Sequence, residues 1–396
     1  MKSEKVARIS GTVAPGFERC RDAFATGLRG GAEVGAACSI RVKGETVVDL
    51  WGGVADADSG AAWRADTIVP VFSVSKGVAA VCVLHLVSQG LIDLDAPVAR
   101  YWPEFAQAGK GALTVRNALA HRAGVPFIDG DVSAEQIGDV EHMAARLAAQ
   151  PPMFEPGSVH IYHAVTVGWF TSELVRRVTG QTVGQWLADN VATPLDLSLY
   201  FGVPRADQQR VARLVHRDPA QAAAVIEASM APGSLPWQVM TINGALSFAA
   251  DFGKGSLNDP HVQSMELAGA ALVADARSLA TFYAACLAPI DGIRLLSDEV
   301  IADAIRPVST GKQFGLEEEG PAWGAGLMIP WRVQPMLGGS SFGHDGMGGS
   351  LAFASPEREV GFAYVRNGMA AGGVEDPEVY AVVKALDDIL DERIKA

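Results

Sequence analysis

Cysteine is scarce in this sequence of 396 residues, and the few cysteines present form no recognisable pattern. The four of them, Cys20, Cys38, Cys82 and Cys286, are far apart and include no CxxC pair. The disulfide frameworks of secreted domains and zinc knuckles both depend on closely spaced cysteines. We therefore expect neither, and interpret the four cysteines as free and mostly buried thiols.

Long apolar runs are also missing. The run from Val78 to Val87 is about half of the ~20 residues that a membrane-spanning helix needs. No apolar segment of the signal-peptide kind follows the opening residues Met1 to Lys5. We expect a cytoplasmic protein that makes no contact with a membrane.

Positive charge is in short supply. Only 19% of the residues are charged, and 45 Asp and Glu stand against 32 Lys and Arg, which gives a net charge of −13. Without a basic stripe, neither a nucleic acid nor an anionic membrane surface is an expected partner. No nucleotide-binding fingerprint and no metal-ligand spacing stands out, so we expect no cofactor and no metal. The sequence carries no signal for an oligomeric state.

Apolar material, by contrast, is plentiful. Hydrophobic residues make up 49% of the chain, and the length corresponds to roughly two to three typical domains. Strand patterns occur near both ends of the sequence, and helical patterns broken by Pro and Gly fill the stretch between them. The hairpins are predicted at 36–52 and 350–366, and helices at 14–31, 73–89, 166–179 and 376–394.

This distribution predicts an α+β fold. Its antiparallel sheet would be built from N- and C-terminal strands and flanked by helices, with an inserted, mostly helical lobe. Residues 1–90 and 290–396 would form the sheet domain and residues 91–289 the helical domain. An active site would lie at the interface of the two.

The strongest motif is Ser73-Val74-Ser75-Lys76, an SxxK at the start of the apolar segment 73–89. Residues three apart share a helical face, so the Lys76 ammonium can reach the Ser73 hydroxyl. Burial can lower the lysine pKa until it accepts the serine proton. A plain N-cap serine is the alternative interpretation, because helices often begin with serine.

Two further segments strengthen this motif. Tyr162 stands just before the apolar helix predicted at 166–179, where a phenol could share a proton with Ser73 and Lys76. The glycine-rich stretch around His344-Asp345-Gly346 precedes the late hairpin, and such a stretch can bring backbone N–H groups close to a ligand. A half-buried tyrosine and a tight turn are the ordinary alternatives.

In this order, Ser73-x-x-Lys76, Tyr162 and His344-Asp345-Gly346 resemble the three motifs of the serine β-lactamase and penicillin-binding-protein superfamily. The flanking sequence resembles the class C β-lactamase-like branch that includes the family VIII carboxylesterases. The resemblance implies a β-lactamase/transpeptidase-like fold over roughly residues 15–395, and an oxyanion hole formed by the backbone N–H groups of Ser73 and Met347. The segments that carry it besides the motifs are Leu113–Gly124, Tyr162–Gly168 and Gly269–Ala280.

The sequence departs from the β-lactamases of that branch at two motifs. Ala164 stands where they carry asparagine in Tyr-x-Asn, and His344-Asp345-Gly346 replaces Lys-Thr-Gly. The missing groups would hold the side-chain amide and the carboxylate of a β-lactam. Their loss favours a less polar ester as substrate, with His344 and Gly346 among the substrate-binding residues.

Other motifs are weaker candidates. A GxSxG match at Gly339–Gly343 has only His344 downstream, which is too close to serve an α/β-hydrolase Ser341. A second SxxK at Ser309–Lys312 precedes no apolar helix. His160 and His163 lack a third metal ligand, so we expect structural roles for them, with His163 also lining the substrate cleft.

The sequence thus predicts a serine carboxylesterase that hydrolyses small or short-chain carboxylic esters through an acyl-enzyme on Ser73. Lys76 and Tyr162 would together take and return the serine proton, and which of them is the base stays open. A β-lactamase or D-amino-acid peptidase and an acyltransferase acting on an alcohol are enzymatic alternatives. A non-catalytic acyl-binding sensor is the alternative outside enzymes.

Overall fold

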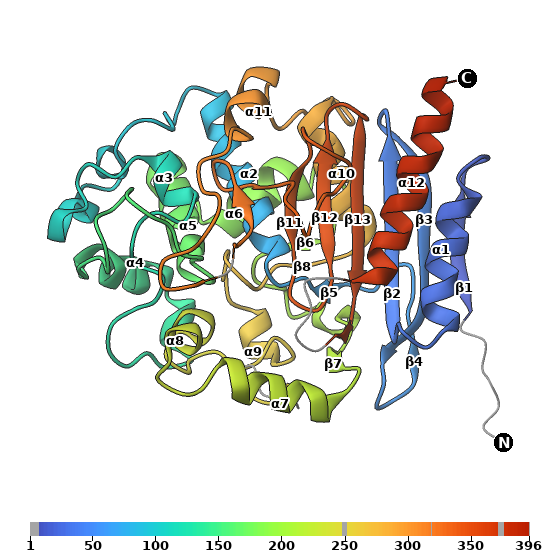
Figure 1. The fold of residues 1–396 in the computed structure, drawn as a ribbon, viewed down its shortest axis with the longest axis horizontal. Coiled ribbons are helices and arrows are strands. Elements are labelled where there is room, and N and C mark those ends of the chain that lie inside the picture. Colours follow the sequence, from blue (N-terminus) through green and yellow to red (C-terminus); the bar gives the residue numbers. More distant parts are fainter. Residues whose placement is uncertain (1–7, 248–251, 318, 371–375, 396) are drawn as a thin grey trace.

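An antiparallel sheet built from both ends of the chain forms the centre of the protein (Figure 1). The structure, a computed structural model, describes residues 8–247, 252–317, 319–370 and 376–395. Within these residues the sheet has nine strands in the order β1-β3-β2-β13-β12-β11-β10-β9, with β4 paired to β3. The strands are β1 (Ile9–Val13), β2 (Gly35–Val42), β3 (Glu45–Asp56), β4 (Ala61–Ala62), β9 (Ala322–Trp323), β10 (Met328–Ile329), β11 (Phe342–Asp345), β12 (Leu351–Ser355) and β13 (Val360–Arg366).

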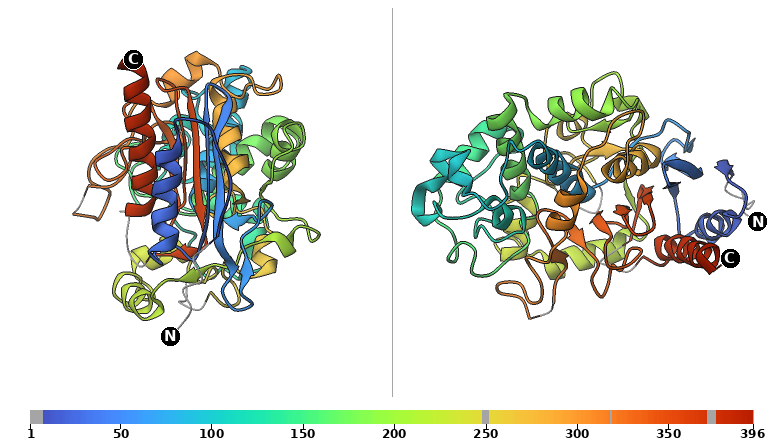
Figure 2. Two further views of the ribbon diagram at one scale, coloured as in Figure 1. Left: turned by 90° about the vertical axis from the view of Figure 1, so that its right-hand side faces the viewer. Right: turned by 90° about the horizontal axis from the view of Figure 1, so that it is seen from above.

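Helices cover both faces of this sheet, as the two views of Figure 2 show. On one face α1 (Glu18–Arg29) and α12 (Pro377–Lys395) lie side by side. On the other face α10 (Ala276–Leu287) packs on β13, and α2 (Val74–Ser88) packs on β11. The helices near both ends of the sequence therefore supply the outer layer on one face, and the segment that follows Ser73 lies inside the molecule.

Strand β13 shows why two cores form. Successive side chains of a strand point to opposite faces. Phe362 and Tyr364 accordingly belong to the core beneath α1 and α12. Ala363 and Val365 belong to the core that contains α2 and α10. The sequence of α2 is apolar nearly all round, which predicted that the helix is buried. In the structure, α2 is enclosed on nearly all sides.

The inserted helical part lies beside the sheet, and a group of short elements closes the molecule below it (Figure 1). Many of these helices begin at a Ser, Thr or Asp whose side chain accepts a backbone hydrogen bond, as for Thr182 and Asp218. The helices are α3 (Val115–Leu119), α4 (Val140–Ala149), α5 (Thr166–Thr179), α6 (Val183–Leu187), α7 (Pro219–Ser229), α8 (Leu235–Thr241), α9 (Pro260–Gln263) and α11 (Asp298–Ala304). The short strands are β5 (Val69–Pro70), β6 (Leu199–Tyr200), β7 (Val215–His216), β8 (Val273–Ala274) and β14 (Gly368–Met369).

The α+β class and the sheet built from both termini are confirmed. The division into residues 1–90 with 290–396 and residues 91–289 stays a prediction, and α10, which lies in the second of these parts, packs on the sheet. The four cysteines are buried and free, as expected. None of the helices in the described part of the chain is long and apolar enough to cross a bilayer.

Candidate active site

The hydroxyl of Ser73 is the meeting point of two polar side chains. Ser73 immediately precedes α2, yet its side chain makes no capping hydrogen bond to that helix. Instead its Oγ accepts hydrogen bonds from Lys76 Nζ at 2.9 Å and from the Tyr162 hydroxyl at 2.8 Å. The N-cap interpretation is therefore wrong, because a capping serine accepts from the backbone of its own helix.

The turn before Ser73 is strained. Phe72 has a φ of +49°, in the left-handed region that residues with a side chain rarely adopt. The Ser75 hydroxyl donates to the Phe72 carbonyl and accepts from the Leu272 N–H at 2.9 Å, so the turn is held from both sides. Strain maintained in this way is typical of functional positions and fixes the direction of the Ser73 side chain.

Lys76 is buried, and no carboxylate makes an ion pair with it in the described residues. Its Nζ donates to the Gly269 carbonyl at 2.6 Å, besides the Ser73 hydroxyl, and lies 4.7 Å from the centre of the Tyr162 ring. Burial lowers the pKa of Lys76 to about 7, and the charge of Asp345 partly opposes this shift. Near neutral pH a large fraction of Lys76 is thus uncharged and able to accept a proton.

A close contact between two glycines places the Gly269 carbonyl. A Cβ atom on Gly168, in α5, would lie 2.1 Å from the Gly269 nitrogen. A Cβ on Gly269 would lie 2.5 Å from the Val165 carbonyl oxygen. Only residues without side chains allow this approach, so the Lys76 acceptor depends on both glycines.

Tyr162 is held by aromatic and polar contacts. Its ring stacks on Trp323 with centroids 5.6 Å apart, and the His121 ring lies 5.0 Å away. Its backbone N–H donates to Gln313 Oε1 at 2.7 Å. Burial raises the pKa of the phenol above its ordinary value, while the hydrogen bond to Ser73 opposes this shift. The resting phenol is therefore a neutral donor aimed at Ser73.

The glycine-rich stretch after β11 forms one wall beside Ser73. A Cβ on Gly346 would lie 2.3 Å from the Val71 carbonyl oxygen. Only glycine therefore allows this stretch to lie so close to the turn before Ser73. No hydrogen bond within the described residues uses the backbone N–H of Ser73 or Met347. Both groups are thus free to donate to a substrate oxygen.

These residues open onto a cavity of about 480 Å³. The predicted residues Ser73, Tyr162, His344, Gly346 and Met347 all contribute to its lining. The remaining lining is mostly apolar and comes from α7, α8, β14 and α12. The Ser73 hydroxyl, which has two neighbours that can exchange protons, thus faces an apolar chamber. This arrangement suits nucleophilic attack on a carbonyl compound.

The sequence matches the Beta-lactamase family over residues 20–386, well over half of the chain. The chain belongs to the Beta-lactamase family. It is similar to the Esterase/beta-lactamase LipL of Mycobacterium tuberculosis, with 35% identity over 375 residues that cover 91% of this chain and 83% of that protein. Esterase EstB of Burkholderia gladioli is 28% identical over 341 residues, 80% of each chain. The chain is also similar to the crystal structure of a family VIII carboxylesterase, with a TM-score of 0.85 and 34% sequence identity. The match covers 96% of this chain and 100% of that one.

These similarities confirm the resemblance found in the sequence, and with it the prediction of a serine hydrolase. The assignment of individual residues within this Beta-lactamase family member rests on the geometry alone. The structure brings Ser73, Lys76 and Tyr162 together as predicted, but the roles of the three stay a proposal.

His163 does not lie where the sequence suggested. It is completely buried and is not part of the cavity lining. Its Nε2 accepts from the Val125 N–H at 3.2 Å, and its Nδ1 lies 2.6 Å from the Ile161 carbonyl oxygen. Burial lowers the pKa of His163 to about 4, so the ring is neutral. It supports the backbone around Tyr162 and does not line the cleft.

The two competing serine motifs lie away from the cavity. Ser341 is fully buried, and the residues after it form strand β11 in place of the helix that an α/β-hydrolase requires. Ser309 donates its hydroxyl to the Ala120 carbonyl at 2.6 Å, while the exposed Lys312 pairs with Glu317. In the part of the chain that the structure describes, neither hydroxyl is hydrogen-bonded to a basic side chain.

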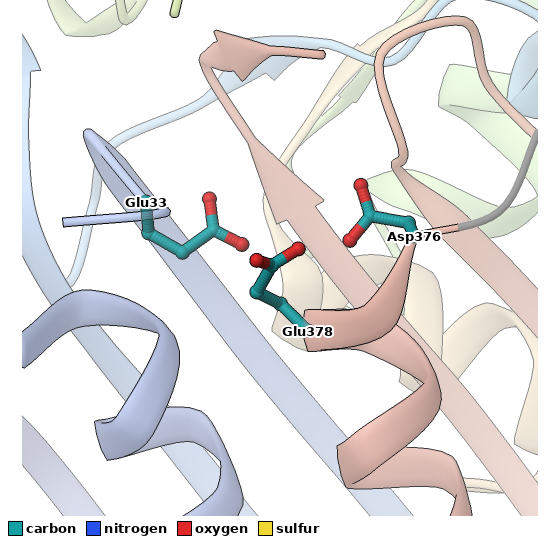
Figure 3. Close-up of side chains that lie close together, drawn as sticks. All are labelled: Glu33, Asp376 and Glu378. Carbon is teal, nitrogen blue, oxygen red and sulfur yellow. The ribbon is translucent and has the colours of Figure 1, made fainter. Parts of the chain in front are cut away.

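Three carboxylates, Glu33, Asp376 and Glu378, converge where the chain enters β2 and α12 (Figure 3). They are the one group of three potential metal ligands within 4.8 Å of each other among the described residues. The buried Arg366 guanidinium hydrogen-bonds both Glu33 and Asp376. A guanidinium thus supplies the positive charge that a cation would bring, and we interpret the group as an ion-pair network.

Three contributors to the site escaped the sequence analysis. The Gly269 carbonyl has no side chain to signal its role, although its segment was part of the resemblance. Trp323 and Gln313 lie far from Tyr162 in the sequence and belong to no motif. Only the fold brings them together.

Proposed function

We propose that this protein is a serine carboxylesterase that hydrolyses small carboxylic esters through an acyl-enzyme on Ser73. One observation carries the proposal: the Ser73 hydroxyl is hydrogen-bonded to Lys76 and Tyr162 and not to its own helix. A serine hydroxyl is a weak nucleophile until a neighbour takes its proton, and the Lys76–Tyr162 pair is in position to do so.

The reaction would run in two halves. Ser73 Oγ attacks the ester carbonyl carbon, and its proton passes to the Lys76–Tyr162 pair. The backbone N–H groups of Ser73 and Met347 stabilise the oxyanion, which collapses as the alcohol leaves with the proton. Water then attacks the acyl-enzyme, the pair takes a proton from that water, and Ser73 recovers a proton as the carboxylic acid is released.

The names of both relatives and of the similar crystal structure include an esterase, which supports ester hydrolysis, and the name of LipL adds a beta-lactamase. The residues at the motif positions weigh against a β-lactam as the main substrate. Ala164 is buried and offers no amide, and His344 and Asp345 replace the lysine and threonine that would bind the β-lactam carboxylate. A cytoplasmic location and the absence of macromolecular partners stay predictions from the sequence.

The test compares p-nitrophenyl esters with a chromogenic cephalosporin and labels the protein with a fluorophosphonate. We expect ester kcat/KM to exceed that for the cephalosporin, and Ser73→Ala to abolish both turnover and labelling. Ser341→Ala is the matched control and should keep both. If the acylated protein transfers its acyl group to an added alcohol faster than to water, the protein is an acyltransferase. If it binds an ester but is not labelled by the fluorophosphonate, it is an acyl-binding sensor.

A further inference from the structure

The cavity beside Ser73 is larger and more apolar than a short ester requires. Its volume of about 480 Å³ falls within the range of roughly 300–1,000 Å³ found for pockets that enclose drug-sized ligands. Two groups of apolar side chains contribute to its lining. They are Val225, Ile226, Met230, Met240 and Phe252 on one part of the lining, and Met347, Met369, Val379 and Val383 on another.

Helix α7 lies along the edge of the molecule below the sheet (Figure 1) and provides much of this lining. Ala222, Val225, Ile226 and Ser229 face the cavity at the three- and four-residue spacing of one helical face. Ala222 is buried, whereas its neighbours Ala223 and Ala224 are exposed. The small side chain of Ala222 therefore leaves open space in the chamber.

Building on the esterase function, we propose that the preferred substrates are esters with one bulky, apolar substituent, aromatic or branched, which lies against α7 and α12. Burial of such a group is favourable in proportion to the apolar surface that leaves water, so a phenyl-sized group should tighten binding by about tenfold or more. A small ester such as ethyl acetate leaves the chamber filled with water and gains none of this. Ala222 is then a specificity-determining residue.

The test compares ethyl acetate with two esters that each carry one additional benzyl group. Ethyl 3-phenylpropanoate carries it on the acyl side and 3-phenylpropyl acetate on the alcohol side, and acid release is followed by titration. We expect at least one of the bulky esters to exceed ethyl acetate in kcat/KM by about tenfold or more, mainly through a lower KM. The pair of bulky esters also tells whether the chamber receives the acyl or the alcohol group.

Two tryptophan variants then locate the effect. Ala222→Trp fills the chamber and should reduce the ratio of bulky-ester to ethyl acetate kcat/KM to about one. Ala223→Trp places the same side chain on the exposed face of α7 and should leave the ratio as in the wild type. Should Ala222→Trp not fold, Ala222→Leu provides a milder blockade with the same expected direction.

An equal kcat/KM for all three esters in the wild type would overturn the proposal while leaving the esterase function intact. The same holds if Ala222→Trp and Ala223→Trp change the ratio alike. Lack of turnover of every ester, including the p-nitrophenyl series, would overturn the esterase function itself.

Discussion

The ammonium nitrogen of Lys76 lies 4.7 Å from the centre of the Tyr162 ring, and both side chains hydrogen-bond the same Ser73 oxygen. A proton leaving Ser73 thus meets two neighbouring groups that also interact with each other. Groups coupled this closely titrate as a pair, so the reaction depends on the pair more than on either member.

This coupling predicts non-additive losses. Tyr162→Phe keeps the ring stacked on Trp323 and removes only the hydroxyl, so the fold should persist while kcat falls by about 10²–10⁴-fold. Lys76→Ala should lose at least as much, and the double variant little more than the worse single variant. Circular dichroism and steady-state kinetics of the three variants check this. A folded Tyr162→Phe with nearly wild-type kcat would remove the phenol from the mechanism.

The pH profile should reflect the lysine. Because burial lowers the pKa of Lys76 to about 7, the base form predominates above that pH, and kcat/KM should rise with pH through about 7. Asp345 holds the pKa of Lys76 higher than burial alone would. Asp345→Asn should therefore move the acid limb to lower pH, while Asp22→Asn on the distant helix α1 should not. An acid limb that stays in place in Asp345→Asn would contradict this electrostatic account.

The glycine contact should be sensitive to a single methyl group. Gly168→Ala would place a Cβ 2.1 Å from the Gly269 nitrogen and push the Lys76 acceptor away. Overpacking of this kind costs about 1–3 kcal/mol of stability, and kcat should fall in addition because Lys76 loses its position. Gly111→Ala, whose Cβ would meet nothing closer than 3.5 Å, is the control. Urea denaturation and kinetics separate the two effects, and a fully active Gly168→Ala would refute the role of the contact.

The ion-pair network should make stability depend on pH. Three carboxylates, Glu33, Asp376 and Glu378, face two guanidiniums, Arg366 and Arg217, so one bound proton would balance the charge. Burial, the largest cause, raises the pKa of Glu33 to about 7 and that of Asp376 to about 6, while Arg366 opposes both shifts. The pKa of Glu33 is also lowered by the Tyr364 hydroxyl that donates to it.

A carboxyl whose pKa is raised on folding binds protons more tightly in the folded state, so its stabilising contribution is lost as pH rises through the folded value. The network's contribution to the free energy of unfolding should therefore decrease from pH 6 to pH 8, whereas Lys76, whose pKa is lowered to about 7, contributes in the opposite direction. Glu33→Gln should flatten this dependence. Glu173→Gln removes a buried carboxylate that pairs with Arg176 and Arg177 elsewhere, and it should destabilise without flattening. Urea denaturation at several pH values measures the free energy of unfolding of both variants. An unchanged pH dependence in Glu33→Gln would contradict the role given to this carboxyl.

Continuous apolar segments with marked ends explain which parts of the fold could be predicted. The helix at 166–179 coincides with α5, and the late hairpin appears as β12 and β13, because Gly180 ends the first segment and Pro356 marks the turn of the second. The two-residue strands carry too few residues for a pattern, and none of the predicted hairpins or helices falls in the segment that holds α7 to α9. Such elements are defined by their neighbours and not by their own sequence.

The residues of the site likewise divide into those that have a local sequence signal and those that have none. Ser73 and Lys76 could be paired from helical spacing alone, whereas Tyr162 needed the resemblance to be placed beside them. The Gly269 carbonyl and Trp323 could not be found, since a backbone acceptor and a stacking partner leave no local signal. His163 was misplaced because proximity to Tyr162 in sequence says nothing about the direction of its ring, which backbone hydrogen bonds fix inward.

The pairing of β2 with β13 joins the two ends of the chain within one sheet. During synthesis the ribosome releases Ser73 and Lys76 early, and the strand and loop that carry Met347 only near the end. Contacts between such distant segments form slowly, because a long loop must close before they gain anything. The apolar faces of α2 and β2 stay uncovered in the meantime, as is common for large domains that need chaperones. A chain that stopped before β11 would hold Ser73 and Lys76 without the Met347 N–H, and therefore without the proposed oxyanion hole.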